Sequence, residues 1–76
     1  MKLKIQIVGG DLIDCQEIFH YEVCYGGKEI TEDEFVKLLE NGGTFHCCSA
    51  LNGGAALAIN TDKVVCFVDG VLYVSK

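Results

Sequence analysis

The clearest pattern of apolar positions lies in the segment Val64–Ser75, which reads VVCFV-DG-VLYVS. Two runs rich in β-branched and aromatic residues flank Asp69-Gly70, and this dipeptide between apolar runs is a strong β-hairpin signal, because a type I′ turn needs positive φ at both central residues. A two-residue loop also fixes the register of the two strands. The predicted opposite pairs are Val68 and Val71, Phe67 and Leu72, Cys66 and Tyr73, and Val65 and Val74.

Both faces of this predicted hairpin are apolar. Alternation along the strands puts Val65, Phe67, Leu72 and Val74 on one face and Val64, Cys66, Val68, Val71 and Tyr73 on the other. A surface hairpin of a small antiparallel protein normally has one polar face. We therefore expect the second face to form a homodimer interface, although a hairpin buried on both sides within the core also fits the pattern.

The remaining strands follow from alternation and composition. Lys2–Val8 alternates strictly, with Leu3, Ile5 and Ile7 on one side. After an expected loop over residues 9–15, a second strand is predicted at Gln16–Tyr25, followed by a Gly-Gly turn. Two further strands are expected at Thr44–Ser49 and Ala55–Ile59.

The segment Thr31–Gly43 predicts a helix with unusually complete end signals. Thr31 is followed three residues later by Glu34, the pattern of a capping box, and three acidic residues occupy the first turn, where the helix dipole favours negative charge. Gly42 at the end is a typical helix stop. Phe35, Leu38 and Leu39 supply the apolar stripe.

These elements predict a single domain over residues 1–76 of the α+β class. We expect the order β-β-α-β-β-β, with one helix packed on one face of a small, mostly antiparallel sheet. So short a chain buries only about 60% of its unfolded surface, so a second subunit is a natural source of extra stability.

Charge is unevenly distributed along the chain. The net charge is −5, and residues 11–40 carry nine acidic residues against two lysines, whereas residues 41–76 are neutral overall. The chain contains no arginine, which disfavours direct nucleic-acid binding. We expect instead that an acidic surface contacts a protein partner with a basic surface, through Asp11, Asp14, Glu17, Glu32, Asp33 and Glu40.

Five cysteines and two histidines raise the question of a metal or thiol site. An odd number of cysteines is unusual for a secreted disulfide framework, and most of them are expected to be buried thiols. If neighbouring strands had a suitable register, one zinc ion could instead be held, or a redox module formed, by His20, Cys24, His46 and Cys48. No CxxC or similar ligand motif supports that alternative, so no cofactor is predicted.

The sequence predicts a non-enzymatic protein. No phosphate-binding glycine motif and no Ser-His-Asp pattern occurs, and His46 and Cys47 would diverge on a strand. No membrane segment or signal peptide is recognised, so a cytoplasmic location is expected. The combined features are typical of small regulatory or inhibitory binding proteins, and phage-encoded anti-defence proteins are similar in general composition. A structural subunit of a larger assembly remains a further alternative.

Overall fold

Six strands and one α-helix are present in the computed structural model, which describes residues 1–20, 29–50, 54 and 56–76. A short 3-10 helix (η2) separates two of the strands. The elements in chain order are β1 (Leu3–Ile7), β2 (Leu12–His20), α1 (Glu32–Asn41), β3 (Thr44–Ser49), β4 (Ala56–Asn60), η2 (Thr61–Lys63), β5 (Val64–Val68) and β6 (Val71–Val74).

The strands form one sheet in the order β4-β3-β2-β1-β6-β5. Every neighbouring pair is antiparallel except β1 and β6, which run parallel. The predicted α+β class and mostly antiparallel sheet are therefore confirmed. The predicted order β-β-α-β-β-β was wrong: four strands follow the helix, because each arm of the C-terminal hairpin is a separate strand of the sheet.

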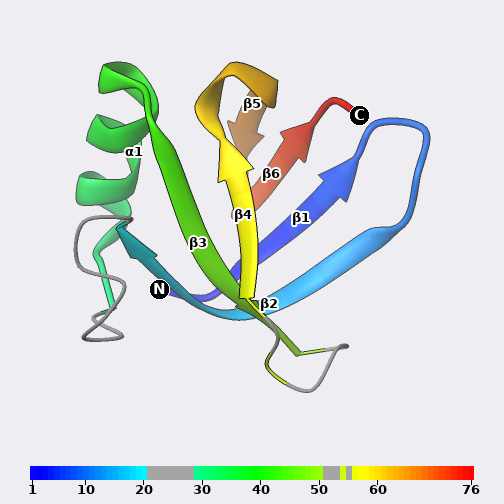
Figure 1. Ribbon diagram of the computed structural model, residues 1–76, viewed down its shortest axis with the longest axis horizontal. Helices are drawn as coiled ribbons and strands as arrows, with labels where there is room; N and C mark the ends of the chain where they lie inside the picture. Colours follow the sequence, from blue (N-terminus) through cyan, green and yellow to red (C-terminus); the bar gives the residue numbers. More distant parts are fainter. Residues whose placement is uncertain (21–28, 51–53, 55) are drawn as a thin grey trace.

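The sheet is strongly bent, and α1 lies beside one of its two arms (Figure 1). Phe35 of α1 is fully buried and packs edge to face on Phe45 of β3 and on Phe67 of β5, at ring-centroid distances of 5.1 and 5.2 Å. The helix thus connects strands that are far apart in the sheet order. Around these rings the buried core contains Leu3, Ile5, Cys15, Ile18, Ile30, Leu38, Cys47, Leu72 and Val74.

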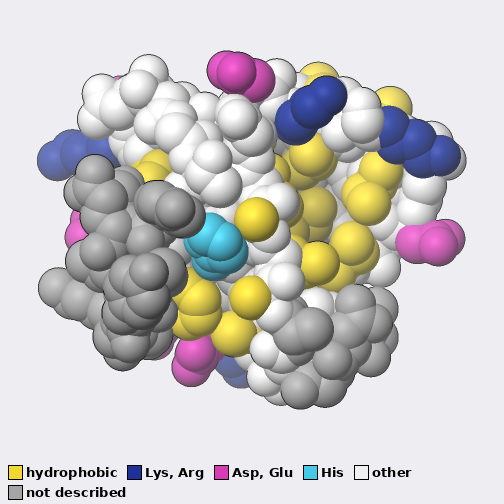
Figure 2. Space-filling model, in the orientation of Figure 1, with side chains coloured by type: hydrophobic (Ala, Val, Ile, Leu, Met, Phe, Trp, Pro, Cys, Tyr) yellow, Lys and Arg dark blue, Asp and Glu magenta, His cyan; other side chains and the backbone are white. Residues whose placement is uncertain are grey.

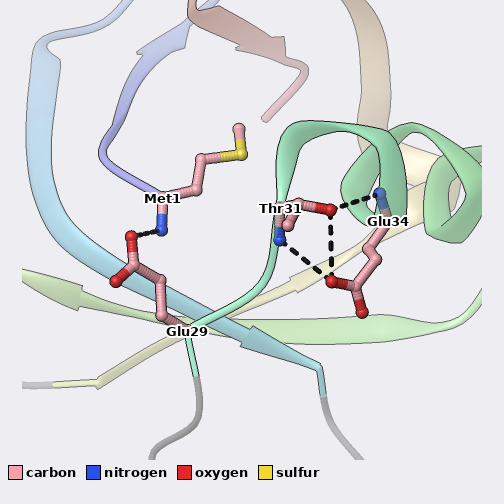
Figure 3. A network of polar contacts seen from close by, with 4 residues as sticks. All are labelled: Met1, Glu29, Thr31 and Glu34. Atoms are coloured by element: carbon pink, nitrogen blue, oxygen red, sulfur yellow. Dashed lines mark hydrogen bonds and ion pairs between the residues drawn. The ribbon is translucent and has the colours of Figure 1, made fainter.

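The N-terminus of α1 has the predicted capping box. The Thr31 Oγ1 accepts a hydrogen bond from the Glu34 backbone N–H at 3.2 Å, and the Glu34 carboxylate accepts one from the Thr31 N–H at 3.2 Å (Figure 3). Two backbone donors that the helix leaves without internal partners are thereby satisfied. Just before the cap, Glu29 forms an ion pair with the Met1 ammonium group. The helix ends at Asn41, and Gly42 has a φ of 81°, in agreement with the predicted stop.

Strand β2 begins earlier than predicted. The loop expected over residues 9–15 is shorter, because Leu12–Asp14 already pair with β1. The pairing of β2 with β3 shifts by one position between Cys15 and Glu17, which makes Gln16 the extra residue of a β-bulge. As a result, Cys15 and Ile18 both lie on the core side. The last part of the predicted strand, at residues 21–25, lies outside the described residues.

The C-terminal hairpin is confirmed, with one change of register. Asp69 and Gly70 have φ values of 51° and 77°, as a type I′ turn requires. Three of the four predicted pairs are present, but Val74 lies opposite Val64 and not Val65. A bulge at Val65 causes this shift, which moves Val64 to the core side.

No helix in the described part of the chain is long and apolar enough to cross a membrane.

Candidate functional site

The outer face of the C-terminal hairpin is apolar and exposed. We use this name for Val65, Cys66, Val68, Val71 and Tyr73. Val65 is 61% exposed and Val68 is 52% exposed, whereas Val71 and Tyr73 are half-buried. Of the predicted dimer interface, four residues lie on this face, while Val64 packs against the core because of the bulge.

The hairpin outer face is bounded by polar residues on one side and by the edge of the sheet on the other. On one side it meets polar residues of β1, since Lys4 lies opposite Val71 and Gln6 lies opposite Tyr73. On the other side it reaches the edge of the sheet, because β5 is the last strand in the order. The five residues of β5 include no charged residue. A strand of this kind carries unpaired backbone groups along its outer side, which makes it a template for pairing with another strand.

The six predicted partner-binding carboxylates are all exposed, but the structure does not bring them together. Asp11 lies in the turn between β1 and β2, and Asp14 and Glu17 lie on β2, where Asp14 is opposite Lys4. The other three, Glu32, Asp33 and Glu40, are on α1, at the far side of the molecule from the β1–β2 turn (Figure 1). In Figure 2 the acidic side chains are correspondingly separated around the periphery.

The helix carries the denser group of negative charge. Its exposed residues include Glu32, Asp33, Glu34 and Glu40 against the single cation Lys37. Val36, which is 38% exposed, lies one turn from both Glu32 and Glu40 on the same helix face. We call Glu32, Asp33, Glu34, Val36, Lys37 and Glu40 the acidic helix face. This face combines negative charge with a small apolar centre at Val36.

A hydrophobic groove of about 270 Å³ lies inside the bend of the sheet. Its walls come from β4 on one side and from β1, β2 and β6 on the other, and Figure 2 shows hydrophobic side chains gathered over this region. The lining residues are Ile5, Ile7, Ile13, Leu57, Ala58, Ile59, Val74, Ser75 and Lys76. The groove is continuous with the core, because five of these residues pack within or against it.

Two buried thiols lie in contact across β2 and β3. The Sγ atoms of Cys15 and Cys47 are 3.2 Å apart, and both side chains are buried. The hydrogen bond with Cys47 lowers the pKa of Cys15, although burial and the charge of Asp14 act in the opposite direction. The same hydrogen bond, together with burial, raises the pKa of Cys47. Either sulfur can be the donor of this hydrogen bond, so the loss of one proton leaves a thiolate that accepts a hydrogen bond from the other thiol.

The four residues considered for a zinc or thiol module are only partly described. His46 and Cys48 share one face of β3 and are half-buried. In the β2–β3 ladder His46 lies opposite Phe19, whereas His20 lies opposite Phe45. The two histidines are therefore not opposite each other in the ladder. Cys24 lies outside the described residues. Across the residues that the structure describes, no three His, Cys, Asp or Glu residues gather as a metal site requires.

Sequence reasoning missed two features, the groove and the Cys15–Cys47 pair. The groove depends on the bend of the sheet, for which the chain carries no local signal. The thiol pair depends on the bulge at Gln16, because strict alternation would place Cys15 on the same face as Glu17. The odd cysteine count pointed only to buried thiols; of the four described cysteines, Cys15 and Cys47 are buried, Cys48 is half-buried and Cys66 is exposed.

Comparisons of the chain with protein-family models, with curated proteins and with solved structures found no match.

Proposed function

We propose that the protein is a small, non-enzymatic module that binds other proteins. The observation that carries this proposal is the exposed apolar outer face of the hairpin, at the edge of the sheet. Single exposed apolar residues are common on protein surfaces, but here Val65, Cys66 and Val68 are exposed together on an uncharged edge strand. Covering such a face and edge is favourable for both the apolar side chains and the backbone groups of β5.

A second copy of the chain is the first partner that this surface fits. An edge strand can pair antiparallel with its own copy about a twofold axis, so that the same patch is used on both subunits. The two sheets then continue into each other, and the outer faces of the two hairpins lie side by side across the new strand pair. In this proposal β5 forms the seam of a homodimer, with Cys66, Val68, Val71 and Tyr73 at the interface.

The acidic helix face is proposed to contact a different protein, one with a basic surface. Negative charge at this face attracts such a partner over a distance of about 10 Å at moderate salt and raises the rate of association. If the basic surface normally binds nucleic acid, occupying it blocks that binding. The protein would then be an inhibitor, of the kind that phages use against host defence.

Affinity capture with two matched variants tests the role of the hairpin. Wild-type protein, Val68→Lys and Val8→Lys are immobilised and exposed to a cell extract. Val8 is the control, because it is also 52% exposed but lies outside the hairpin. Proteins held by wild type and by Val8→Lys, and lost from Val68→Lys, support a binding surface on the hairpin. Identical capture by all three proteins contradicts it.

Reversing the charge of Glu40 tests the acidic helix face separately. Glu40 lies near the end of α1, where the helix has no basic residue, so a lysine there interacts favourably with the helix dipole. Glu40→Lys is therefore expected to fold at least as stably as wild type while it weakens partner binding. The neutral variant Glu40→Gln should weaken binding less. Binding that is unaffected by either variant, or by added salt, would exclude the acidic face as the contact.

A further inference from the structure

The contact between Cys15 and Cys47 is a feature that protein binding does not explain. The two residues are 32 positions apart in the chain and lie on neighbouring strands. Their sulfur atoms are 3.2 Å apart, and a disulfide has an S–S distance of about 2.05 Å. The sulfur atoms therefore need to approach by only about 1 Å, and the strands already hold the two side chains against each other.

Both thiols are buried, since Cys15 is 4% exposed and Cys47 is fully buried. Cys15 lies on the core side of β2 beside the bulge at Gln16, near the end of the β2–β3 ladder. A small oxidant therefore reaches the pair when the strands open locally at this end, and the second thiol is then already in place to react with the product.

We propose that Cys15 and Cys47 form a reversible redox site that hydrogen peroxide converts to an intramolecular disulfide. The Cys15 thiolate attacks one oxygen of the peroxide, so that an S–O bond forms and the O–O bond breaks. The hydroxide that leaves takes a proton from solvent to become water, and Cys15 becomes a sulfenic acid. Cys47 then attacks the Cys15 sulfur, the S–S bond forms, and the second hydroxide leaves as water with the Cys47 proton.

The two steps balance as a two-electron oxidation. Two thiols and one peroxide molecule give one disulfide and two water molecules, and a dithiol reductant returns the protein to its starting form. The disulfide would link β2 to β3 beside the bulge at Gln16. Since both strands are already neighbours there, oxidation is expected to keep the fold. It restricts the unfolded chain across a long loop, so the oxidised protein should melt at a higher temperature.

A variant that retains only the two proposed cysteines tests this site. Cys24, Cys48 and Cys66 are replaced by alanine, and the protein is treated with peroxide under native conditions. It is then unfolded and alkylated, and its mass is measured. We expect a product lighter by two hydrogen atoms with no alkylated cysteine, restored to two alkylated thiols by prior reduction. Its melting temperature should lie several degrees above that of the reduced form.

The matched control exchanges one cysteine for its neighbour. In the control, Cys15 and Cys48 are retained and Cys47 is replaced by alanine with the others. Cys48 lies on the opposite face of β3 from Cys47, so no intramolecular disulfide is expected there. Linkage that forms equally well in the control would overturn the proposal, as would two unreacted thiols or a Cys15 sulfonic acid without a disulfide. Should either variant fail to fold, wild-type protein is oxidised and digested after glutamate residues, because Glu17 and Glu22 separate Cys15 from Cys24. Tandem mass spectrometry of the linked peptide then distinguishes Cys47 from Cys48 and Cys66, which lie in the same fragment. A linked Cys15–Cys47 peptide then supports the site, and its absence contradicts it.

Discussion

Val64 lies opposite Val74 in the C-terminal hairpin, and this one pairing decides which of Val64 and Val65 is exposed. The bulge at Val65 moves Val64 to the core side and leaves Val65 61% exposed. Without the bulge, Val65 would lie opposite Val74, whose side chain is buried. The bulge therefore adds an exposed valine to the outer face of the hairpin, beside Cys66 and Val68.

Replacing Phe35 should destabilise the protein severely. This ring is fully buried between Phe45 and Phe67 and joins the helix to two strands. Phe35→Ala is expected to cost about 3–5 kcal/mol, which is comparable to the whole stability of a domain of this size. Phe35→Leu should cost less, and Val36→Ala, at a half-exposed position next to it, should change the free energy of unfolding by no more than about 0.5 kcal/mol. Urea unfolding followed by circular dichroism measures all three. Equal stability of Phe35→Ala and Val36→Ala would show that the ring is not part of the core.

The capping box predicts a moderate and specific effect at Thr31. Thr31→Ala removes the acceptor for the Glu34 N–H and should lower the free energy of unfolding by about 1 kcal/mol. Thr31→Ser keeps the hydroxyl and should be close to wild type. Thermal unfolding of the three proteins at one pH checks this order. A serine variant as unstable as the alanine variant would mean that the hydroxyl does not cap the helix.

The ion pair between Glu29 and Met1 predicts a pH-dependent difference in stability. The hydrogen bond and charge of the Met1 ammonium lower the pKa of Glu29 in the folded protein. A lowered folded-state pKa stabilises the fold above the pKa of the unfolded state, and this contribution is lost as the pH falls through the folded-state pKa. Wild type should therefore be more stable than Glu29→Gln near neutral pH, and the difference should disappear in acid. The effect should be small, because Glu29 is exposed.

Melting temperatures of wild type and Glu29→Gln across an acidic pH series measure this difference. Glu17→Gln serves as the control, since Glu17 is also exposed but lies on β2 and not on the helix. A difference between wild type and Glu29→Gln that stays constant down to strongly acidic pH would contradict the ion pair.

The sequence predicted best the features that depend on neighbouring residues. The capping box needs only Thr31 and Glu34, and the type I′ turn needs only Asp69 and Gly70, so both could be read from short motifs. The helix and most strands followed for the same reason. The end of the helix at Gly42 was also predicted, because a residue with positive φ is favourable there only as glycine or asparagine.

Features that depend on distant residues could not be predicted in this way. The parallel pairing of β1 with β6 joins the two ends of the chain, and the bulges at Gln16 and Val65 arise where strands adjust to one another. A single bulge reverses the faces of the residues beyond it, so alternation placed Val64 on the wrong side and gave no sign of the Cys15–Cys47 contact. The predicted acidic residues were exposed as expected, but their separation follows from the three-dimensional arrangement of β2 and α1.

We propose above that the hairpin outer face binds protein, first of all a second copy of the chain. Sedimentation equilibrium of the reduced protein over a range of concentrations tests it most directly, with Val68→Lys and the equally exposed Val8→Lys in parallel. A reductant prevents exposed Cys66 from forming disulfide dimers that would mimic association. We expect wild type and Val8→Lys to be dimeric and Val68→Lys to be monomeric. A wild type that stays monomeric at every concentration, or a Val68→Lys variant that dimerises as strongly as wild type, would contradict it.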